Sequence, residues 1–438
     1  MKRSGSTLLF QLFFAVLTLY VVDAYAEVIS LQQGLRIVAE KGRSISISRT
    51  DEQIAEAESR MAFSRMLPSV NASASWTALA HQPAALFGPS PVPLSETDFF
   101  SYSLSVQQTL FDFRGNAARY DASVSVLAAK RHETRRMRNL SAIEFVLAYL
   151  DLLEQDKMAG VASQEVLALE AHSRDAGNLF AAGVITRNDM LQAEVKLSDA
   201  RQRLLTIQMI KIVQAGRLNT LLVRPLGSEL SVSDIDGING DQPALPDMQR
   251  AMLMAEQQRP ELRIADETLK SLGFEQTAKK SEFFPRFFVK GGYDFTENRY
   301  QLHEGNWSVT LGLNINLFNG GATRSEIGRI RLQQEKLAEQ RTKLHDEIML
   351  ELQQAMLRMT TARERLNVAE SAVAQADENL RINRVRYEEG IGTGTDVLDA
   401  IALLATAGTN RYRALYDLRK SEAAVMYATG TDLLEVYK

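Results

Sequence analysis

The chain has 438 residues, of which 45% are hydrophobic and 24% charged, and its net charge is −4. These values exclude wholesale disorder and give no basic footprint for nucleic acid, so we expect no nucleic-acid partner. There is no cysteine, which excludes disulfides, thiolate metal sites, cysteine catalysis and a lipid anchor on cysteine. The five histidines are not spaced as metal ligands, so we expect no metal centre.

Residues 1–26 predict a secretory signal peptide. A short basic start precedes an apolar run from Leu8 to Val22, and Ala24-Tyr25-Ala26 places small residues at the two positions that a signal peptidase reads. The alternative is a transmembrane anchor, but this needs about 20 apolar residues. We therefore expect cleavage before Glu27. The rest of the chain has no apolar run of that length, so any membrane crossing would use strands.

Four later segments alternate apolar and polar residues with the period of a β-strand. They run from Val70 to Ala78, from Phe100 to Gln107, from Val289 to Thr296 and from Trp307 to Leu317. One face of each is apolar or aromatic and the other is small and hydrophilic, and both tryptophans lie on apolar faces. A soluble β-sandwich with one solvent-exposed face is the alternative explanation of this pattern. Strands of about 10 residues with these two faces better suit a bilayer-spanning barrel with an aqueous lumen. Between the first two, the proline-rich stretch 81–98 predicts a loop.

Proline is absent from residues 94–224 and 286–438, which predicts very long helices. We expect one from Gly115 to about Phe180 and another from Ala322 to about Tyr387, each on the order of 100 Å long and each followed by a glycine turn and a returning helix. A soluble coiled-coil rod is the alternative. Small residues are mixed with Leu and Val instead of forming strict heptads, which favours side-by-side packing into a hollow cylinder.

The sequence contains two related halves at an offset of 207 residues. The offset aligns Leu110-Phe111-Asp112 with Leu317-Phe318-Asn319, and a glycine-turn block shares six residue types. The shared pairs are Arg174/Arg381, Gly183/Gly390, Thr186/Thr393, Asp189/Asp396, Leu191/Leu398 and Ala193/Ala400. We predict a first repeat over 27–225, a connector over 226–247 and a second repeat over 248–438, each repeat with a helix, two strands and a long helical hairpin.

Four strands cannot close a barrel by themselves. An open sheet edge in lipid leaves unpaired backbone groups, each of which costs several kcal/mol, and small barrels start at about eight strands. The chain is therefore expected to oligomerise, with a four-stranded panel from each protomer. Three copies would give 12 strands and a lumen wide enough for water.

Taken together, these motifs resemble the TolC-like outer membrane factor (outer membrane efflux protein) family. They comprise a proline between helix and strand, a Leu-Phe-[Asp/Asn] exit from the second strand and a Gly-x-x-Thr-x-x-Asp-x-Leu hairpin tip, in the same order in both halves. The resemblance implies an α+β membrane protein. It would be a homotrimer with a 12-stranded β-barrel, four strands per protomer, in the outer membrane of a Gram-negative bacterium. A long α-helical barrel would continue it across the periplasm.

The resemblance also implies roles for residues at the hairpin tips. A periplasmic adaptor (membrane fusion) protein would contact Gly183, Val184, Thr186, Gly390, Ile391 and Thr393. The periplasmic entrance would be lined or held shut by Asp396, Asp399, Tyr387 and Asp189. Read from the residues alone, an aspartate near a helix start is more often a charge that complements the helix dipole. Some family members carry an arginine at the gate where this chain has Gly392, so its closure contacts differ.

The expected function is a passive exit duct of a tripartite efflux or type I secretion system, opened at its tip by the adaptor and an inner-membrane RND or ABC pump. Its other partners would be two further copies and outer-membrane lipid. The alternative is a non-transporting envelope rod or adhesin, which would not need a wet face on every strand. The sequence has no Gly-x-Ser-x-Gly, P-loop or His-Glu-x-x-His signature, so we expect neither an enzyme nor a cofactor.

Overall fold

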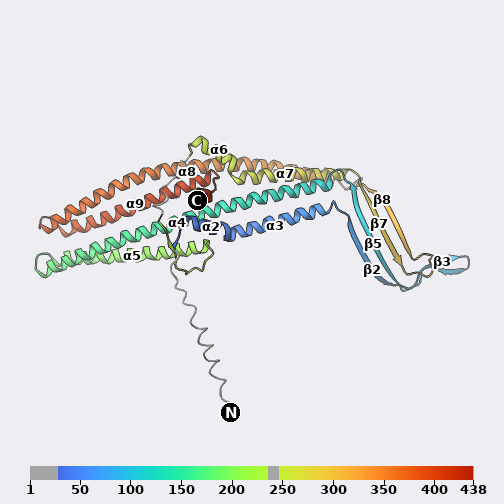
Figure 1. Cartoon of the computed structure of the whole chain (residues 1–438), viewed down its shortest axis with the longest axis horizontal. Coiled ribbons are helices and arrows are strands. Elements are labelled where there is room, and N and C mark those ends of the chain that lie inside the picture. The colour runs from blue at the N-terminus through green and yellow to red at the C-terminus, as the bar shows by residue number, and fades with distance from the viewer. Residues whose placement is uncertain (1–27, 235–245, 438) are drawn as a thin grey trace, which may run out of the picture.

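The computed structural model describes residues 28–234 and 246–437. The predicted signal peptide (1–26) and part of the predicted connector (226–247) lie outside the described residues. The molecule is elongated, with a sheet at one end and the tips of two long helical hairpins at the other (Figure 1).

The predicted strands form one antiparallel sheet in the order β2-β5-β7-β8. Their bounds are β2 Ser69–Ala78, β5 Asp98–Phe111, β7 Arg286–Thr296 and β8 Gly305–Asn314. Pro68 and Pro285 stand directly before β2 and β7, at the first position where the lost N–H costs no ladder bond. The sheet is open, because β2 and β8 each have one neighbour only.

The register confirms that each strand has an apolar and a polar face. Ala72, Leu104, Tyr293 and Trp307 are paired in one row across the four strands, and the rings of Tyr293 and Trp307 lie 5.0 Å apart. The next row on the other face consists of Asn71, Ser105, Gly292 and Ser308. Since partners across an antiparallel pair share a face, each face is continuous across the sheet.

Two sequence-based expectations about the strands were wrong. The fourth strand ends at Asn314 and not at Leu317, because its last partner is Arg286 and the preceding Pro285 has no N–H to offer. The stretch 81–98 is not only loop. It contains a hairpin of β3 (Ala84–Phe87) and β4 (Ser90–Pro93), which extends beyond the sheet (Figure 1).

The β3–β4 hairpin forms despite its prolines because a two-stranded ribbon has outward-facing edges that tolerate them. Its two-residue loop starts with Gly88 at φ +72°, and glycine is favoured at this first position of a type II′ hairpin turn.

The helices confirm the predicted long hairpins. α4 (Gly115–Ala181) and α8 (Ala322–Glu388) have 67 residues each, and α5 (Arg187–Leu221) and α9 (Gly394–Ala428) have 35 each. Each returning helix covers the half of its partner nearest the tip. The half nearest the sheet packs against shorter helices, namely α2 (Leu31–Lys41), α3 (Arg43–Ser64), α6 (Met248–Gln258) and α7 (Pro260–Lys280). No helix among the described residues is both long and apolar enough to cross a membrane.

The same backbone turn leads from the sheet into both long helices. The residue before α4 is Arg114 at φ +69°, and the residue before α8 is Gly321 at φ +84°. The residue before each of these, Phe113 or Gly320, also has a positive φ. The second half of the chain thus has glycine at both positions, where the left-handed conformation has no steric cost. The first half has residues with side chains there, and these disfavour the left-handed conformation.

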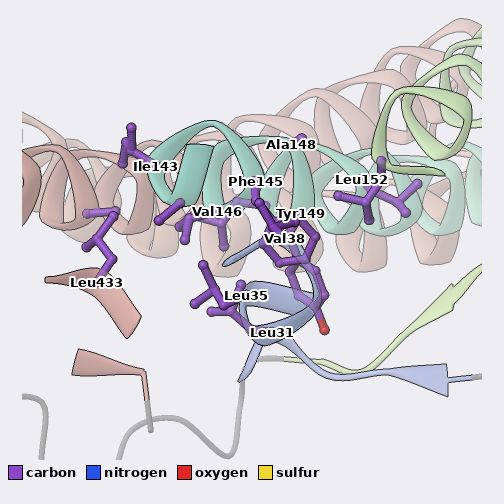
Figure 2. Packing of buried hydrophobic residues seen from close by; sticks show 14 of the residues in the cluster. Leu31, Leu35, Val38, Ile143, Phe145, Val146, Ala148, Tyr149, Leu152 and Leu433 are labelled. Carbon is purple, nitrogen blue, oxygen red and sulfur yellow. The ribbon is translucent and has the colours of Figure 1, made fainter. Parts of the chain in front are cut away.

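The largest apolar core lies midway along the molecule. Leu31, Leu35 and Val38 of α2 face the rings of Phe145 and Tyr149 of α4 (Figure 2), and both rings are fully buried. The Tyr149 hydroxyl donates to the backbone oxygen of Ser233 at 2.7 Å, and this satisfies its one polar atom. The core also holds the short C-terminal helix α10 (Leu433–Val436), so it ties both halves of the chain together.

Candidate functional site

The two hairpin tips are built by the same turn. At the end of α4 the N–H of Gly183 donates to the Phe180 oxygen and that of Val184 to the Leu179 oxygen, both at 2.9 Å. The second tip repeats both bonds, at 3.1 and 2.9 Å, around Gly390. This is the Schellman motif, which requires a left-handed residue. Gly183 and Gly390 supply it at φ +74° and +69°.

Each returning helix then begins with a capping box. The Thr186 N–H donates to Asp189 Oδ2 (3.1 Å), and the Asp189 N–H donates to Thr186 Oγ1 (3.3 Å). Thr393 and Asp396 make the same pair of bonds at 3.0 and 3.2 Å. The hydrogen bonds from Thr393 hold the pKa of Asp396 below its usual range. Both aspartates therefore cap the start of their helix. This agrees with the alternative that an aspartate near a helix start stabilises the helix end.

Each tip presents one apolar side chain to solvent. Val184 is 68% exposed and Ile391 is 72% exposed, and each follows the left-handed glycine. In a Schellman motif this residue commonly packs back onto its own helix. Here both side chains are instead left available to a partner.

Tyr387, predicted for the entrance, lies where the two hairpins meet. Its ring packs at a tilt against His172 of α4, with centroids 5.4 Å apart. Burial first, and then the negative charges of Asp175 and Asp189, raise the pKa of Tyr387. No described residue forms a hydrogen bond with its hydroxyl, so within the protomer the ring itself makes the contact.

A second contact joins the hairpins through a residue that had no predicted role. Thr395 Oγ1 of α9 donates to Gln192 Oε1 of α5 at 3.3 Å. Gln192 stands 207 residues before Asp399, the position where the first repeat lacks the second acid. Asp399 itself is exposed and forms no hydrogen bond or ion pair with any described residue, so its carboxylate is not committed to the helix cap.

His172 was the most important residue that sequence reasoning missed. It is only 7% exposed and shares the buried face of α4 with Leu169 and Ala176. The one signal in the sequence is a single histidine at helical spacing within this apolar stripe, which on its own indicates a core residue more often than a functional one.

A groove of about 540 Å³ lies between α5 and α9 in the half of the helices nearest the tips. Its floor is α4, and its walls carry charges of both signs from Lys196, Asp199, Arg203 and Arg413. Among the described residues no three His, Asp or Glu side chains are grouped as they would be to bind a metal ion. The tips thus offer surfaces and helix ends, which are features of a contact site.

The sequence profile described as "Outer membrane efflux protein" matches residues 35–222 and 252–431. The chain belongs to this outer membrane efflux protein family. The outer membrane protein OprJ of Pseudomonas aeruginosa is 22% identical over 417 residues, which cover 91% of this chain and 84% of OprJ. The outer membrane efflux protein BepC of Brucella suis is 23% identical over 339 residues, covering 75% of this chain and 71% of BepC.

Solved structures of outer membrane proteins share the fold. The channel OprN superposes with a TM-score of 0.80 at 18% identity, covering 91% of this chain and 89% of OprN. VceC of Vibrio cholerae superposes with a TM-score of 0.77 at 17% identity, and the match covers 92% of this chain and 96% of VceC. The predicted family is thus confirmed. Outer membrane efflux proteins are channel proteins of Gram-negative outer membranes.

Proposed function

We propose that three copies of this chain form a passive exit duct across the outer membrane and periplasm. A periplasmic adaptor and an inner-membrane RND or ABC pump would open it at the hairpin tips. The observation that carries this proposal is the open four-stranded sheet with one apolar and one polar face.

The two free edges support a trimer. β2 runs away from the helices and β8 runs back toward them (Figure 1), so β2 of one copy can pair antiparallel with β8 of the next. Three such junctions leave no unpaired edge in lipid and give 12 strands. The apolar face, where Trp307 and Val309 are 75% and 83% exposed in the protomer, then faces lipid, and the serine-rich face lines the lumen.

The helices offer matching contact surfaces for the neighbouring copy. α5 carries a row of apolar side chains that no described residue covers. They are Leu205, Met209, Ile212 and Val213, between 58% and 72% exposed. Monomeric soluble proteins rarely expose contiguous apolar patches of this kind, and side-by-side packing of helices from neighbouring copies would bury the row.

At the tips, Val184 and Ile391 with their glycine turns would bind the adaptor, and the groove between α5 and α9 would receive its helices. Tyr387 would hold the entrance closed. Asp396 and Asp399, together with Asp189, would form a ring of carboxylates around it that favours cations.

The first experiment separates a duct from a rod or adhesin. Detergent-purified protein should have about three times the protomer mass by light scattering and should conduct ions in planar bilayers. A trimer that never conducts, even after Tyr387→Ala, would favour the non-transporting alternative. A stable monomer would contradict the architecture.

The second experiment tests the carboxylate ring. The double change of Asp396 and Asp399 to asparagine should lower cation preference and weaken block by a trivalent cation. Asp346→Asn is the matched control, because Asp346 is also an exposed acid (76%) but lies in the middle of α8. Equal effects from both variants would place the tip carboxylates on the outer surface.

A further inference from the structure

His172 is a buried polar residue near the tips of the hairpins. Throughout residues 160–210 and 360–410, all of which the structure describes, every other buried side chain is apolar or alanine. A histidine is the one side chain whose ordinary pKa, near 6.5, lies in the physiological range. Its charge can therefore change under conditions that leave the neighbouring apolar core intact.

Three helices surround the imidazole. α8 contributes the ring of Tyr387 and the positive charge of Arg384, and α4 contributes Asp175 one turn away. The first residue of α9, Gly394, lies so close that a Cβ there would stand 3.7 Å from His172 Nε2. No described residue forms a hydrogen bond with either ring nitrogen. His172 thus fills the junction where α4 meets the turn of the second hairpin.

A neutral imidazole suits this position and a charged one does not. Burial lowers the pKa of His172, and Arg384 adds to this effect, while Asp175 opposes it. An imidazolium would carry two N–H donors into a place where neither ring nitrogen forms a hydrogen bond with a described residue. If the α8–α9 hairpin moves away from α4, water can reach the ring and its pKa returns toward the ordinary value.

We propose that neutral His172 is the positioning residue that holds Tyr387, and with it the second hairpin, against α4, and that protonation of His172 releases the entrance. This inference rests on the proposed channel function and adds an acid-sensitive closure to it.

The direction follows from linkage. Because the closed state has the lower pKa, protons bind the open state more tightly, so acid favours opening, and no effect is expected well above pH 6.5. One pH unit below the ordinary pKa, the equilibrium constant for opening rises by at most about tenfold per subunit. In a trimer whose three sites open together, the open fraction should depend on proton concentration with a Hill coefficient above one and no higher than three.

The test is single-channel recording on the purified trimer between pH 7.5 and 5.5. Wild type should show a rising open fraction as the pH falls. His172→Phe keeps an aromatic ring at the junction but cannot take up a proton, so it should stay closed across the range. Tyr387→Leu removes the ring that contacts His172, so it should raise the open fraction already at pH 7.5.

His132→Phe is the matched control. Burial also lowers the pKa of His132, but this residue lies in the first third of α4 (Gly115–Ala181), where its charged neighbours include Glu267 and Lys270 of α7. A pH response lost in His132→Phe and kept in His172→Phe would overturn the inference, as would a conducting wild type without pH response. If no variant conducts at any pH, the channel function itself fails. Light scattering on each variant checks that the trimer is intact.

Discussion

Exchanging one residue on each face of β8 for arginine tests which side of the sheet meets lipid. Val309 is the fifth of ten residues in β8, which places it near the bilayer midplane if the strand spans the membrane. It is 83% exposed on the apolar face and pairs with Gly291. Val309→Arg should cost about 2–4 kcal/mol per protomer, hence about 6–12 kcal/mol for three copies. Assembly should then weaken by about four or more powers of ten.

The matched control is the preceding residue. Ser308 lies at nearly the same depth on the opposite face, and its partner Gly292 leaves room for a long side chain. Ser308→Arg should therefore assemble like wild type and change only ion selectivity. The assay is the fraction of protein recovered from the outer membrane as trimer, measured by light scattering in detergent. Normal assembly of Val309→Arg together with loss of the Ser308→Arg trimer would show that the two faces are reversed.

Two further predictions concern the tips. Gly390→Ala should destabilise the second tip by about 1–2 kcal/mol because alanine disfavours the positive φ, whereas Gly328→Ala, in the open interior of α8, should stabilise its helix by about 1 kcal/mol. Amide hydrogen exchange would measure both, and the same sign at both positions would refute the argument. Thr393→Ala should cost the start of α9 about 1 kcal/mol through its lost capping bond and speed exchange there. Thr395→Ala loses only the bond to Gln192, so it should leave amide exchange at the start of α9 unchanged. Equal exchange rates in the two variants would mean that the cap contributes nothing to the stability of this helix start.

The tips show how far the sequence can predict the candidate site. The repeated Gly-x-x-Thr-x-x-Asp pattern located both turns, because a left-handed glycine and a capping box are set by residues within one turn of each other. The same locality explains why Asp189 and Asp396 form caps in the structure. His172 and Gln192 could not be found in this way. Their partners Tyr387 and Thr395 are more than 200 residues away, and only the packing of the two hairpins brings them together.

The sequence by itself determined the elements and their amphipathic faces. The period-two pattern, the prolines at the strand starts and the long proline-free stretches act over a few residues, so they predicted the four strands and the two long hairpins. The tertiary structure alone decided the strand order β2-β5-β7-β8, the end of β8 at Asn314 and the β3–β4 hairpin. The strand order and the end of β8 depend on which distant backbone groups are available for pairing, and the β3–β4 hairpin depends on pairing across the Gly88 turn. Local periodicity carries no information about such partners, because a hydrogen-bond ladder forms only after the chain has brought its strands side by side.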